Sequence, residues 1–376
     1  MYKNKSEYSN KLIAILLPSL GGGGTEKVCI ELARSFKKMG YSVEFIVVHK
    51  YDNKDYFHYQ ANLEFTIYKL DLNRFRSVPF LLRKYLLNRK PAALIASMWP
   101  LTTAAVLGRF LSGSKTRLLL IEHGVLSIQY AKLGILHKFL LRVSMVATYR
   151  FADAIVGVSL GVSKDVASLS NLLPGRVRTI YNPIKLAIFP LKNEFEAIEK
   201  LWDCPRGGRI LTVGSLKDIK NHSLLLRAFK KIAKPGLKLM ILGVGKNEKK
   251  LRNLANDLNI TNSIIFAGFH LNTSLFYSTA DLFVLTSDSE GFGNVIVEAL
   301  SFGVSVVSTD CPFGPSEILQ NGLLGKLTPV GDEEKLSEAM IEVLLNPFDK
   351  KMLMKRSLDF EPQLISQQYL NLLGFK

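Results

Sequence analysis

The chain has 376 residues, of which 48% are hydrophobic and 22% are charged. This length exceeds what one hydrophobic core usually organises, so it predicts two domains of fewer than about 200 residues each. The cysteines Cys29, Cys204 and Cys311 are widely spaced and form no CxxC pair. This pattern argues against a disulfide framework or a zinc site and favours a reducing compartment.

The amino-terminal segment MYKNKSEYSNKLIAILLP contains only a short apolar run before a proline. A signal peptide needs a longer apolar run and a small-residue cleavage site, so we interpret this segment as a polar tail that leads into a strand. No stretch approaches about 18 consecutive apolar residues. We therefore expect no spanning helix, and any membrane contact would be peripheral.

Positive charge is concentrated in the first half of the chain. Residues 1–185 contain 27 Lys and Arg against 11 Asp and Glu, whereas the remaining residues contain 22 against 21. This asymmetry favours an anionic partner for the first half, although a basic solubilising surface would give the same composition. Nucleic acid is disfavoured as that partner, because no recognisable binding module or aromatic stacking platform accompanies the cations.

Short apolar runs alternate with amphipathic helical stretches along the chain. The order begins with KLIAILLP, TEKVCIELARSFKKMG and YSVEFIVVH, and further strands are expected at 93–97, 117–121 and 154–158. It restarts with RILTVGS, a helix over 222–233, LKLMILG, SIIFAG, DLFVLTS and VSVVST. Parallel strands require crossover helices, so this order predicts two doubly wound parallel sheets with a boundary near 182–209. Ligands of such sheets bind beyond the carboxyl ends of the strands, which predicts a site in the cleft between the domains.

A glycine-rich turn follows the first expected strand. The strand ends at Pro18 and leads into SLGGGGTEKV, in which Gly21–Gly24 precede a helix. Backbone amides without side chains approach a bound diphosphate closely, and the helix N-terminus behind them favours negative charge. Alone this signal is weak, because many glycine turns only connect a strand to a helix. The motif is neither GxGxxG nor a Walker loop, which disfavours nicotinamide-cofactor and P-loop proteins.

The most specific segment is DSEGFGNVIVEALSFGVSVVST. In it Glu290 and Glu298 flank a turn formed by Gly291, Phe292, Gly293 and Asn294. We expect a helix to start at this turn, with Glu290 at its rim and Glu298 deeper inside, since eight positions span a little over two turns. A carboxylate accepts both hydroxyls of a ribose, while amides at a helix start cap phosphate charge. Taken alone, the two glutamates are better interpreted as ordinary helix-flanking acids, because an acid at a helix N-terminus is common.

Together with GGTEKV, IEHG around His123 and VGSLKDIKN, this segment resembles the retaining glycosyltransferase family 4. The order and spacing of these motifs agree across nearly the whole chain. The resemblance implies the GT-B fold, with a Rossmann-like acceptor-side domain at 1–187, a Rossmann-like nucleotide-sugar donor domain at 188–354, and a helix at 355–376 that returns to the first domain. The later TDCPFGPSEILQNGLLGKLTPVGD resembles a segment of bacterial members that build lipid-linked polysaccharides and glycans.

The resemblance also implies roles for the matching residues. His123, Glu290 and Lys220 are the expected catalytic residues, of which His123 would lie near the anomeric centre, Glu290 near the sugar and Lys220 at the diphosphate. The expected donor-binding set is Gly23 and Gly24 near the diphosphate, Ser215, Lys217, Lys220, Glu290, Gly291, Phe292, Gly293 and Asn294, and Glu298 on the nucleotide ribose.

Two of these positions carry an alternative interpretation. A lone histidine beside a strand end is often only a hydrogen-bonded core residue, but the place of His123 after RLLLIE is the ligand-facing edge of a doubly wound sheet. Ser215 stands where family members usually have an arginine. This departure leaves open whether Lys217 compensates for the lost charge or the activity is reduced.

We expect no metal and no cofactor other than the nucleotide-sugar co-substrate. The acidic triplet that begins at Asp288 lacks companion ligands, and Lys220, glycine amides and helix dipoles would neutralise the phosphate charge instead. Retention of anomeric configuration is implied by the resemblance. Since no obvious nucleophile faces the sugar, we expect the nucleotide to depart and the acceptor to attack on the same face, with electrostatic stabilisation of the leaving diphosphate.

Two basic, apolar stretches lie in the first half. In SVPFLLRKYLLNRKP one helical stripe is apolar, and we interpret it as core packing; it consists of Val78, Leu81, Leu82, Tyr85 and Leu86. In QYAKLGILHKFLLRVSMVATYR, Lys132, Lys138, Arg142 and Arg150 stand among many apolar residues. Its apolar face is either core or an interface with anionic lipid, and we favour the lipid interface.

The sequence therefore predicts a cytoplasmic transferase, peripheral on the inner face of the cytoplasmic membrane. It would move a hexose or N-acetylhexosamine from a nucleotide-diphosphate sugar to a polyprenyl-diphosphate-linked saccharide in polysaccharide or lipopolysaccharide assembly, and UDP is chosen from family frequency. Two alternatives stay open. One is a sugar-nucleotide epimerase or hydrolase on the same fold, and the other is a catalytically weak, donor-binding scaffold subunit, which Ser215 favours.

Overall fold

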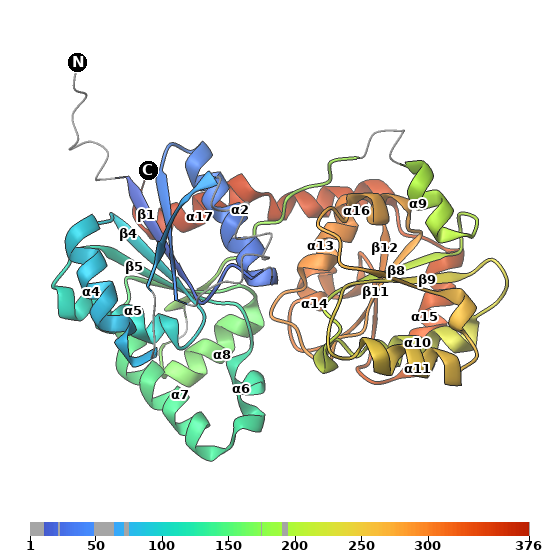
Figure 1. The fold of residues 1–376 in the computed structure, drawn as a ribbon, viewed down its shortest axis with the longest axis horizontal. Helices are drawn as coiled ribbons and strands as arrows, with labels where there is room; N and C mark the ends of the chain where they lie inside the picture. Colours follow the sequence, from blue (N-terminus) through green and yellow to red (C-terminus); the bar gives the residue numbers. More distant parts are fainter. Residues whose placement is uncertain are drawn as a thin grey trace. The chain divides into compact units, whose positions relative to one another are not determined.

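The computed structural model describes residues 11–21, 23–48, 64–70, 75–173, 175–189 and 195–375, except the side chains of Lys132 and Ala197. The chain divides into two compact units, one formed by Met1–Pro183 with Pro362–Lys376 and the other by Ile184–Glu361 (Figure 1). The sequence placed the two boundaries at 187 and 354. Each unit is a parallel α/β sheet, as predicted for the two Rossmann-like domains.

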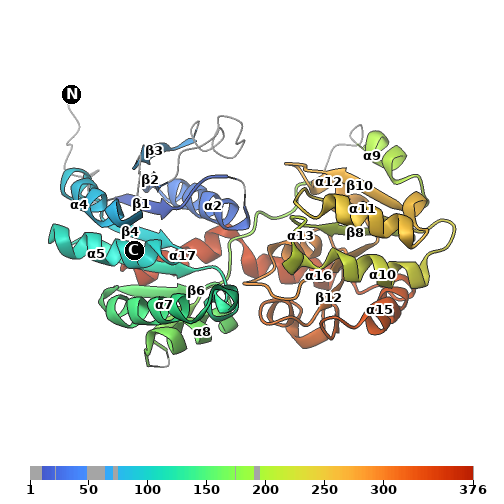
Figure 2. The same ribbon diagram turned by 60° about the horizontal axis from the view of Figure 1, so that its bottom comes forward.

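The first unit contains a seven-stranded sheet in the order β3-β2-β1-β4-β5-β6-β7, which Figure 2 shows from β3 to β6. Every strand pair in it is parallel. All six residues of β1 are buried, as expected for a strand that helices cover on both faces. The strands are β1 (Leu12–Leu17), β2 (Ser42–Val47), β3 (Thr66–Lys69), β4 (Ala93–Ser97), β5 (Arg117–Glu122), β6 (Ala154–Gly157) and β7 (Val177–Thr179).

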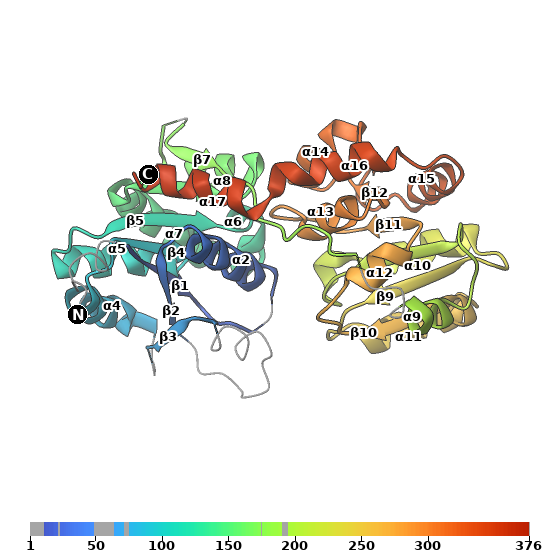
Figure 3. The ribbon, with the colours of Figure 1, turned by 90° about the horizontal axis from the view of Figure 1, so that it is seen from above.

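Helices cover this sheet in two groups. Right-handed crossovers place the helix between β1 and β2 on the face opposite to those between β4, β5 and β6. The last helix, α17, packs against α2, and the Ser35 hydroxyl donates to the Pro362 carbonyl at 3.1 Å (Figure 3). The α-helices are α2 (Gly24–Lys38), α4 (Val78–Arg89), α5 (Leu101–Ser112), α6 (Leu126–Gln129), α7 (Ile135–Thr148), α8 (Leu160–Ser170) and α17 (Pro362–Leu372), with 3-10 turns η1 (Phe75–Ser77), η2 (Ala131–Leu133) and η3 (Tyr149–Phe151).

The apolar stripe predicted near residue 80 is core packing. Helix α4 buries Val78, Leu82, Tyr85 and Leu86 completely, while Leu81 stays partly exposed. The Tyr85 hydroxyl reaches the buried Glu44 carboxylate at 2.7 Å, so the polar end of the ring is satisfied inside the unit.

The second unit contains a six-stranded parallel sheet in the order β10-β9-β8-β11-β12-β13. Its strands are β8 (Arg209–Val213), β9 (Lys238–Leu242), β10 (Ile264–Gly268), β11 (Leu282–Leu285), β12 (Ser305–Thr309) and β13 (Lys326–Thr328). Its helices are α9 (Phe195–Trp202), α10 (His222–Ile232), α11 (Glu248–Asp257), α12 (Ser274–Thr279), α13 (Asn294–Ser301), α14 (Pro315–Ile318), α15 (Glu333–Leu345) and α16 (Lys350–Ser357), with turns η5 (Asp218–Lys220), η6 (Thr261–Ser263), η7 (Gln320–Gly322) and η8 (Leu358–Phe360).

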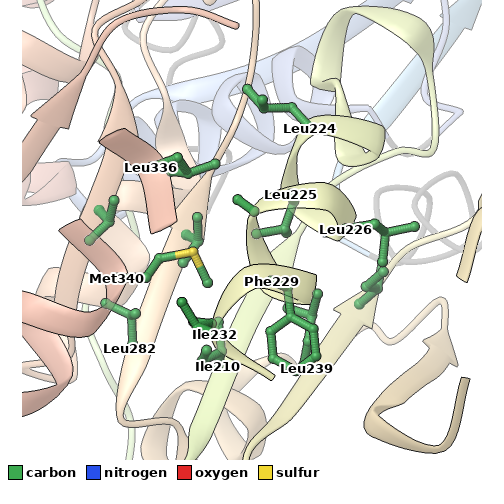
Figure 4. Close-up of a cluster of buried hydrophobic side chains, with 14 of the residues drawn as sticks. Ile210, Leu224, Leu225, Leu226, Phe229, Ile232, Leu239, Leu282, Leu336 and Met340 are labelled. Atoms are coloured by element: carbon green, nitrogen blue, oxygen red, sulfur yellow. The ribbon is translucent and has the colours of Figure 1, made fainter. Parts of the chain in front are cut away.

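The core on one side of this sheet lies between α10, α15 and the strands (Figure 4). Leu225 and Phe229 of α10 are fully buried and face Met340 of α15 above the strands. Burial of each such side chain contributes about 1.5–3 kcal/mol relative to exposure. This packing fixes the start of α10, and with it the loop after β8 that carries Ser215 and Lys220.

No helix in the described part of the chain has both the length and the apolar character needed to cross a bilayer.

Candidate active site

Lys220 and Glu290 meet at the carboxyl edge of the second sheet, the edge at which its strands end. The Lys220 ammonium lies 2.5 Å from Glu290 Oε1, and the Ser287 hydroxyl donates to the same oxygen at 2.6 Å. Both side chains are partly buried, so solvent screens their attraction less than it would on an open surface. The pair places a cation and a hydrogen-bond acceptor side by side, which suits a phosphate next to a sugar hydroxyl.

The loops that carry this pair follow the neighbouring strands β8 and β11. They therefore lie close together and form hydrogen bonds with each other. The Thr286 hydroxyl donates a hydrogen bond to the Lys220 carbonyl at 3.0 Å, and the Asp288 backbone amide donates one to the Ile219 carbonyl at 2.8 Å. The Asn221 amide also donates to Asp288 Oδ1 at 2.8 Å. These three hydrogen bonds hold the backbone on both sides of the ion pair, so its geometry does not depend on the two long side chains alone.

Ser215 and Lys217 lie earlier in the loop after β8, and both are exposed. The loop backbone is held against the next one, since Leu216 donates to the Val244 carbonyl at 3.0 Å. A Cβ on Gly243 would lie 1.9 Å from the Gly214 carbonyl oxygen, so this close approach requires glycine. Among the described residues, no side-chain hydrogen bond or ion pair involves Ser215 or Lys217. Lys217 therefore lies two positions after Ser215, the position at which family members usually have an arginine, and its ammonium has no side-chain partner in the described part of the chain.

The EGFGN segment forms the predicted turn into a helix. Helix α13 begins at Asn294, and Gly293 precedes it with φ of 105°, a left-handed conformation that favours glycine. The Glu290 amide donates to the Pro312 carbonyl at 3.2 Å. A Cβ on Gly314 would lie 2.0 Å from the Phe292 carbonyl oxygen. The turn is thus packed tightly against the loop after β12.

Glu298 lies inside α13 and is 8% exposed. The Tyr277 hydroxyl of α12 donates to its Oε2 at 3.0 Å. Burial, and then the negative charge of Glu298, raise the pKa of Tyr277 well above its usual value. Tyr277 therefore stays protonated and donates a hydrogen bond that orients the carboxylate; the Val295 carbonyl lies further away, at 3.3 Å from the same hydroxyl.

In the first unit, the glycine turn caps α2. Gly23 is the residue before the helix and Gly24 is its first residue. The Glu26 carboxylate folds back over this end, because a Cβ on Gly23 would lie 2.5 Å from Glu26 Oε2. Ser19 donates to the other oxygen of Glu26 at 3.2 Å. An acid in the first turn stabilises the positive end of the helix, so a diphosphate here would compete with Glu26.

His123 follows the end of β5 directly. Both ring nitrogens are buried, and neither has a hydrogen-bond partner among the described residues. Burial lowers the pKa of His123 to about 3, so the imidazole is neutral at physiological pH, with one donor and one acceptor nitrogen. Unsatisfied buried nitrogens cost free energy, and a sugar hydroxyl would satisfy them.

The structure thus brings together Lys220 and Glu290, with Glu298 deeper in the same unit, whereas Ser215 and Lys217 lie in the same loop outside that contact. Gly23, Gly24 and His123 belong to the first unit, at the carboxyl ends of β1 and β5. The described residues contain no group of three or more His, Cys, Asp or Glu side chains placed to hold a metal ion.

Three residues that support the candidate site lie outside the motifs recognised in the sequence. Ser287 precedes Glu290 by three positions, but a serine there gives no signal of its own. Tyr277 and Asn221 act across 21 and 67 positions of the chain, and only the strand order could have brought them to the site.

Comparison with known proteins agrees with this architecture. Residues 22–188 match the model described as Glycosyltransferase Family 4, and residues 205–357 match Glycosyl transferases group 1. The N-acetylgalactosamine-N,N'-diacetylbacillosaminyl-diphospho-undecaprenol 4-alpha-N-acetylgalactosaminyltransferase of Campylobacter jejuni is 29% identical over 88% of this chain and 90% of the relative. The amylovoran biosynthesis glycosyltransferase AmsD of Erwinia amylovora is 22% identical over 97% of this chain and 99% of the relative.

Solved structures show the same fold. HepE of Anabaena in complex with UDP has a TM-score of 0.80 at 18% identity, over 97% of this chain and 99% of that chain. The apo form of the lipopolysaccharide outer core galactosyltransferase WaaB has a TM-score of 0.73 at 19% identity, over 96% and 99%. The two-sheet architecture is therefore GT-B, and the chain belongs to the family 4 and group 1 glycosyltransferases.

Proposed function

We propose that this glycosyltransferase moves a hexose or N-acetylhexosamine from a UDP-sugar, with retention of anomeric configuration, to a saccharide linked to polyprenyl diphosphate. The product would enter lipopolysaccharide or another cell-surface polysaccharide. The Campylobacter relative is named for an acceptor on diphospho-undecaprenol, and HepE was solved with UDP. The observation in this chain that carries the proposal is the Lys220–Glu290 pair, with the buried Glu298 in the same unit.

The donor would be held by three kinds of contact in the second unit. Glu298, oriented by Tyr277, would accept the two ribose hydroxyls. The amides at the start of α13 and the Lys220 ammonium would receive the diphosphate. Glu290 would then accept hydrogen bonds from the donor sugar. This assignment uses no metal ion, so chelation with EDTA should leave the turnover unchanged.

The expected chemistry is departure of the nucleotide with attack by the acceptor on the same face of the sugar. Glu290 Oε1 already accepts hydrogen bonds from Lys220 and Ser287, which lowers its nucleophilicity and favours a role in positioning over one in covalent catalysis. Charge develops on the leaving diphosphate, and Lys220 stabilises it there. The neutral imidazole of His123 would hydrogen-bond a hydroxyl of the transferred sugar.

The acceptor side would lie on the membrane. Helix α7 contacts the loop after β4 through Ser144 and contacts α5 further along through Thr148, so its first half extends beyond the carboxyl edge of the first sheet (Figure 1). That half is apolar and exposed, with Ile135 87% and Phe139 61% exposed. The other exposed residues of α7 up to Val143 are Leu136, His137, Lys138, Leu140, Arg142 and Val143. Exposed apolar groups beside cations fit an anionic lipid surface.

A nucleotide-release assay with a panel of donors tests the proposal, with and without extracted lipid-linked acceptor. We expect UDP release that depends on the acceptor. Turnover of the donor alone would indicate an epimerase or hydrolase. Binding without turnover would indicate a donor-binding subunit, the alternative that Ser215 favours.

A further inference from the structure

Glu122, the residue before His123, is buried at a junction of the first unit. It ends β5 and is 1% exposed. The Trp99 amide donates to its Oε2 at 3.1 Å, while the hydroxyls of Thr102 and Tyr149 reach its Oε1 at 3.0 and 2.5 Å. These partners lie on the loop after β4, on α5 and on η3. One carboxyl group therefore joins three segments at the edge of the sheet where His123 stands.

The three oxygens at Oε1 form a closed triangle. Thr102 Oγ1 and the Tyr149 hydroxyl oxygen are also within hydrogen-bond distance of each other, at 2.8 Å. The triangle has three edges, but the two hydroxyls carry only two protons. A third proton, on Glu122 Oε1, lets each oxygen donate once and accept once. The geometry thus has a place for a neutral carboxylic acid.

The charges around Glu122 also favour its neutral form. Among the described residues, the titratable groups with the largest electrostatic interaction with Glu122 are Tyr149 on η3, Tyr130 between α6 and η2, and Asp165 on α8. None of these is a cation. No ion pair with Glu122 occurs among the described residues, and the neighbouring His123 is neutral. Burial, reinforced by Asp165, raises the pKa of Glu122 to about 7 against the hydrogen bonds that lower it.

The segments joined by Glu122 also contact helix α7. The Trp99 indole donates to Ser144 of α7 at 2.9 Å, and its ring lies edge to face with Tyr130 at 4.9 Å between centroids. Glu122 is also joined directly to His123 by the backbone. A change at this carboxyl group is therefore transmitted to both the candidate catalytic imidazole and the anchor of α7.

We propose that Glu122 is a positioning residue that works as a neutral carboxylic acid, completing a ring of hydrogen bonds with Thr102 and Tyr149 that fixes His123 and the Trp99 turn. The inference rests on the proposed transferase function for its kinetic consequence only. Ionisation removes the proton of one edge and leaves a buried negative charge without a cation. The arrangement then loosens, so transfer slows as the pH rises through about 7.

The experiment compares the wild type with Glu122→Gln in the full chain. A glutamine supplies a donor towards the hydroxyls and a carbonyl for the Trp99 amide, and it does not ionise. We expect the wild-type kcat to fall about tenfold more than that of E122Q between pH 6 and pH 8, the ratio for one group titrating near 7. Tyr149→Phe, which removes one edge of the triangle, should lower kcat at both pH values. UDP affinity should stay unchanged in both variants, because their positions lie in the first unit.

Two measurements need no acceptor, so they separate this inference from the proposed function. Infrared difference spectroscopy should show a protonated carboxyl band that titrates near pH 7 and is absent in E122Q. The folded state binds more protons than the unfolded state between pH 4.5 and 7, so wild-type unfolding free energy should fall relative to E122Q as the pH rises across that range. Absence of the band, or parallel pH dependences of both variants, would overturn the inference. Absence of transfer with the band present would contradict only the proposed function.

Discussion

Lys220 and Glu290 lie 70 positions apart in the chain, yet their side chains form an ion pair 2.5 Å long where β8 and β11 end side by side. In the proposed donor site, this pair is electrically neutral before any donor arrives. A diphosphate that binds there must take Lys220 from Glu290, and in doing so it frees the carboxylate for a sugar hydroxyl. Binding of the phosphate and binding of the sugar are thereby linked through one exchange of partners.

Lys220→Ala should weaken UDP by about 1.5–3 kcal/mol, the range for hydrogen bonds to charged groups, and leave uridine almost unaffected. Calorimetry with both ligands measures the difference. Lys230→Ala is the matched control, since Lys230 is an exposed cation of α10 in the same unit and lies outside the expected donor-binding set. Because the alanine also leaves Glu290 without its cation, Lys220→Ala combined with Glu290→Gln separates phosphate binding from that repulsion. Equal losses for UDP and uridine would show that Lys220 only supports the fold.

Glu298→Ala should weaken UDP binding by a similar amount, about 1.5–3 kcal/mol, if the carboxylate holds the ribose. The 2'-deoxy analogue of UDP provides the control, because the variant should discriminate less between the two ligands than the wild type does. Tyr277→Phe keeps the ring but removes the hydrogen bond to Glu298, and we expect a smaller loss of UDP affinity, about 1 kcal/mol. Undiminished discrimination against the deoxy ligand in Glu298→Ala would rule out the ribose contact.

Ser215→Arg tests the departure from the family pattern. Ser215 is exposed on the loop after β8, so a guanidinium there meets no buried neighbour and adds a bidentate phosphate donor. UDP affinity should rise, and the gain should shrink as salt increases. Ser215→Gln controls for side-chain length. If the arginine leaves UDP affinity unchanged at low salt, the position lies too far from the diphosphate, and Lys217 becomes the candidate for the missing charge.

The strands and helices of this fold could be predicted from sequence because their signals are local. The strand at 93–97 and the helix starting at His222 appear where apolar runs and turn residues placed them. Parallel strands buried on both faces give continuous apolar runs, and these are easy to recognise. The EGFGN turn was also predictable from a local signal, since its glycines indicated a turn into a helix, and α13 begins directly after Gly293.

The contacts that orient the site were not predictable, because they join residues distant in the chain. Ser287 and Tyr277 fix two carboxylates from positions with no motif. Glu122 looked like an ordinary strand-end residue beside His123, and only its burial and its three partners reveal a group that titrates near neutrality. Such properties depend on what the fold packs around a residue.

His123→Phe should separate stability from activity. The imidazole nitrogens are buried without partners among the described residues, and each such group costs about 1–3 kcal/mol. Phenylalanine has a similar shape and no polar atom, so the free energy of unfolding should stay the same or rise by about 1 kcal/mol. Transfer should fall by about 10²–10³-fold, as for loss of a positioned hydrogen-bond partner. Chemical denaturation and acceptor-dependent UDP release measure the two effects. A destabilised variant, or one with full transfer, would identify His123 as a structural residue.

The membrane proposal predicts two separable contributions to vesicle binding. Anionic lipid should attract the cations of the first unit, and this attraction should weaken with salt, because screening limits each charge to about 8 Å at physiological ionic strength. Replacing Lys138 and Arg142 with Gln should cost about 1 kcal/mol per charge. Lys132→Gln belongs to the same test, although its side chain lies outside the described part of the structure.

The second contribution is apolar and should resist salt. Phe139→Ser removes an exposed ring from the first half of α7, so it should weaken binding at high and low salt alike without reducing UDP affinity. Glutamine at Lys249 and Lys250, exposed cations of α11 in the second unit, is the control and should have little effect. Co-sedimentation with vesicles of increasing anionic content measures each variant. If the intact protein ignores anionic vesicles at low salt, the exposed face of α7 does not meet a bilayer, and a water-soluble acceptor becomes the better hypothesis.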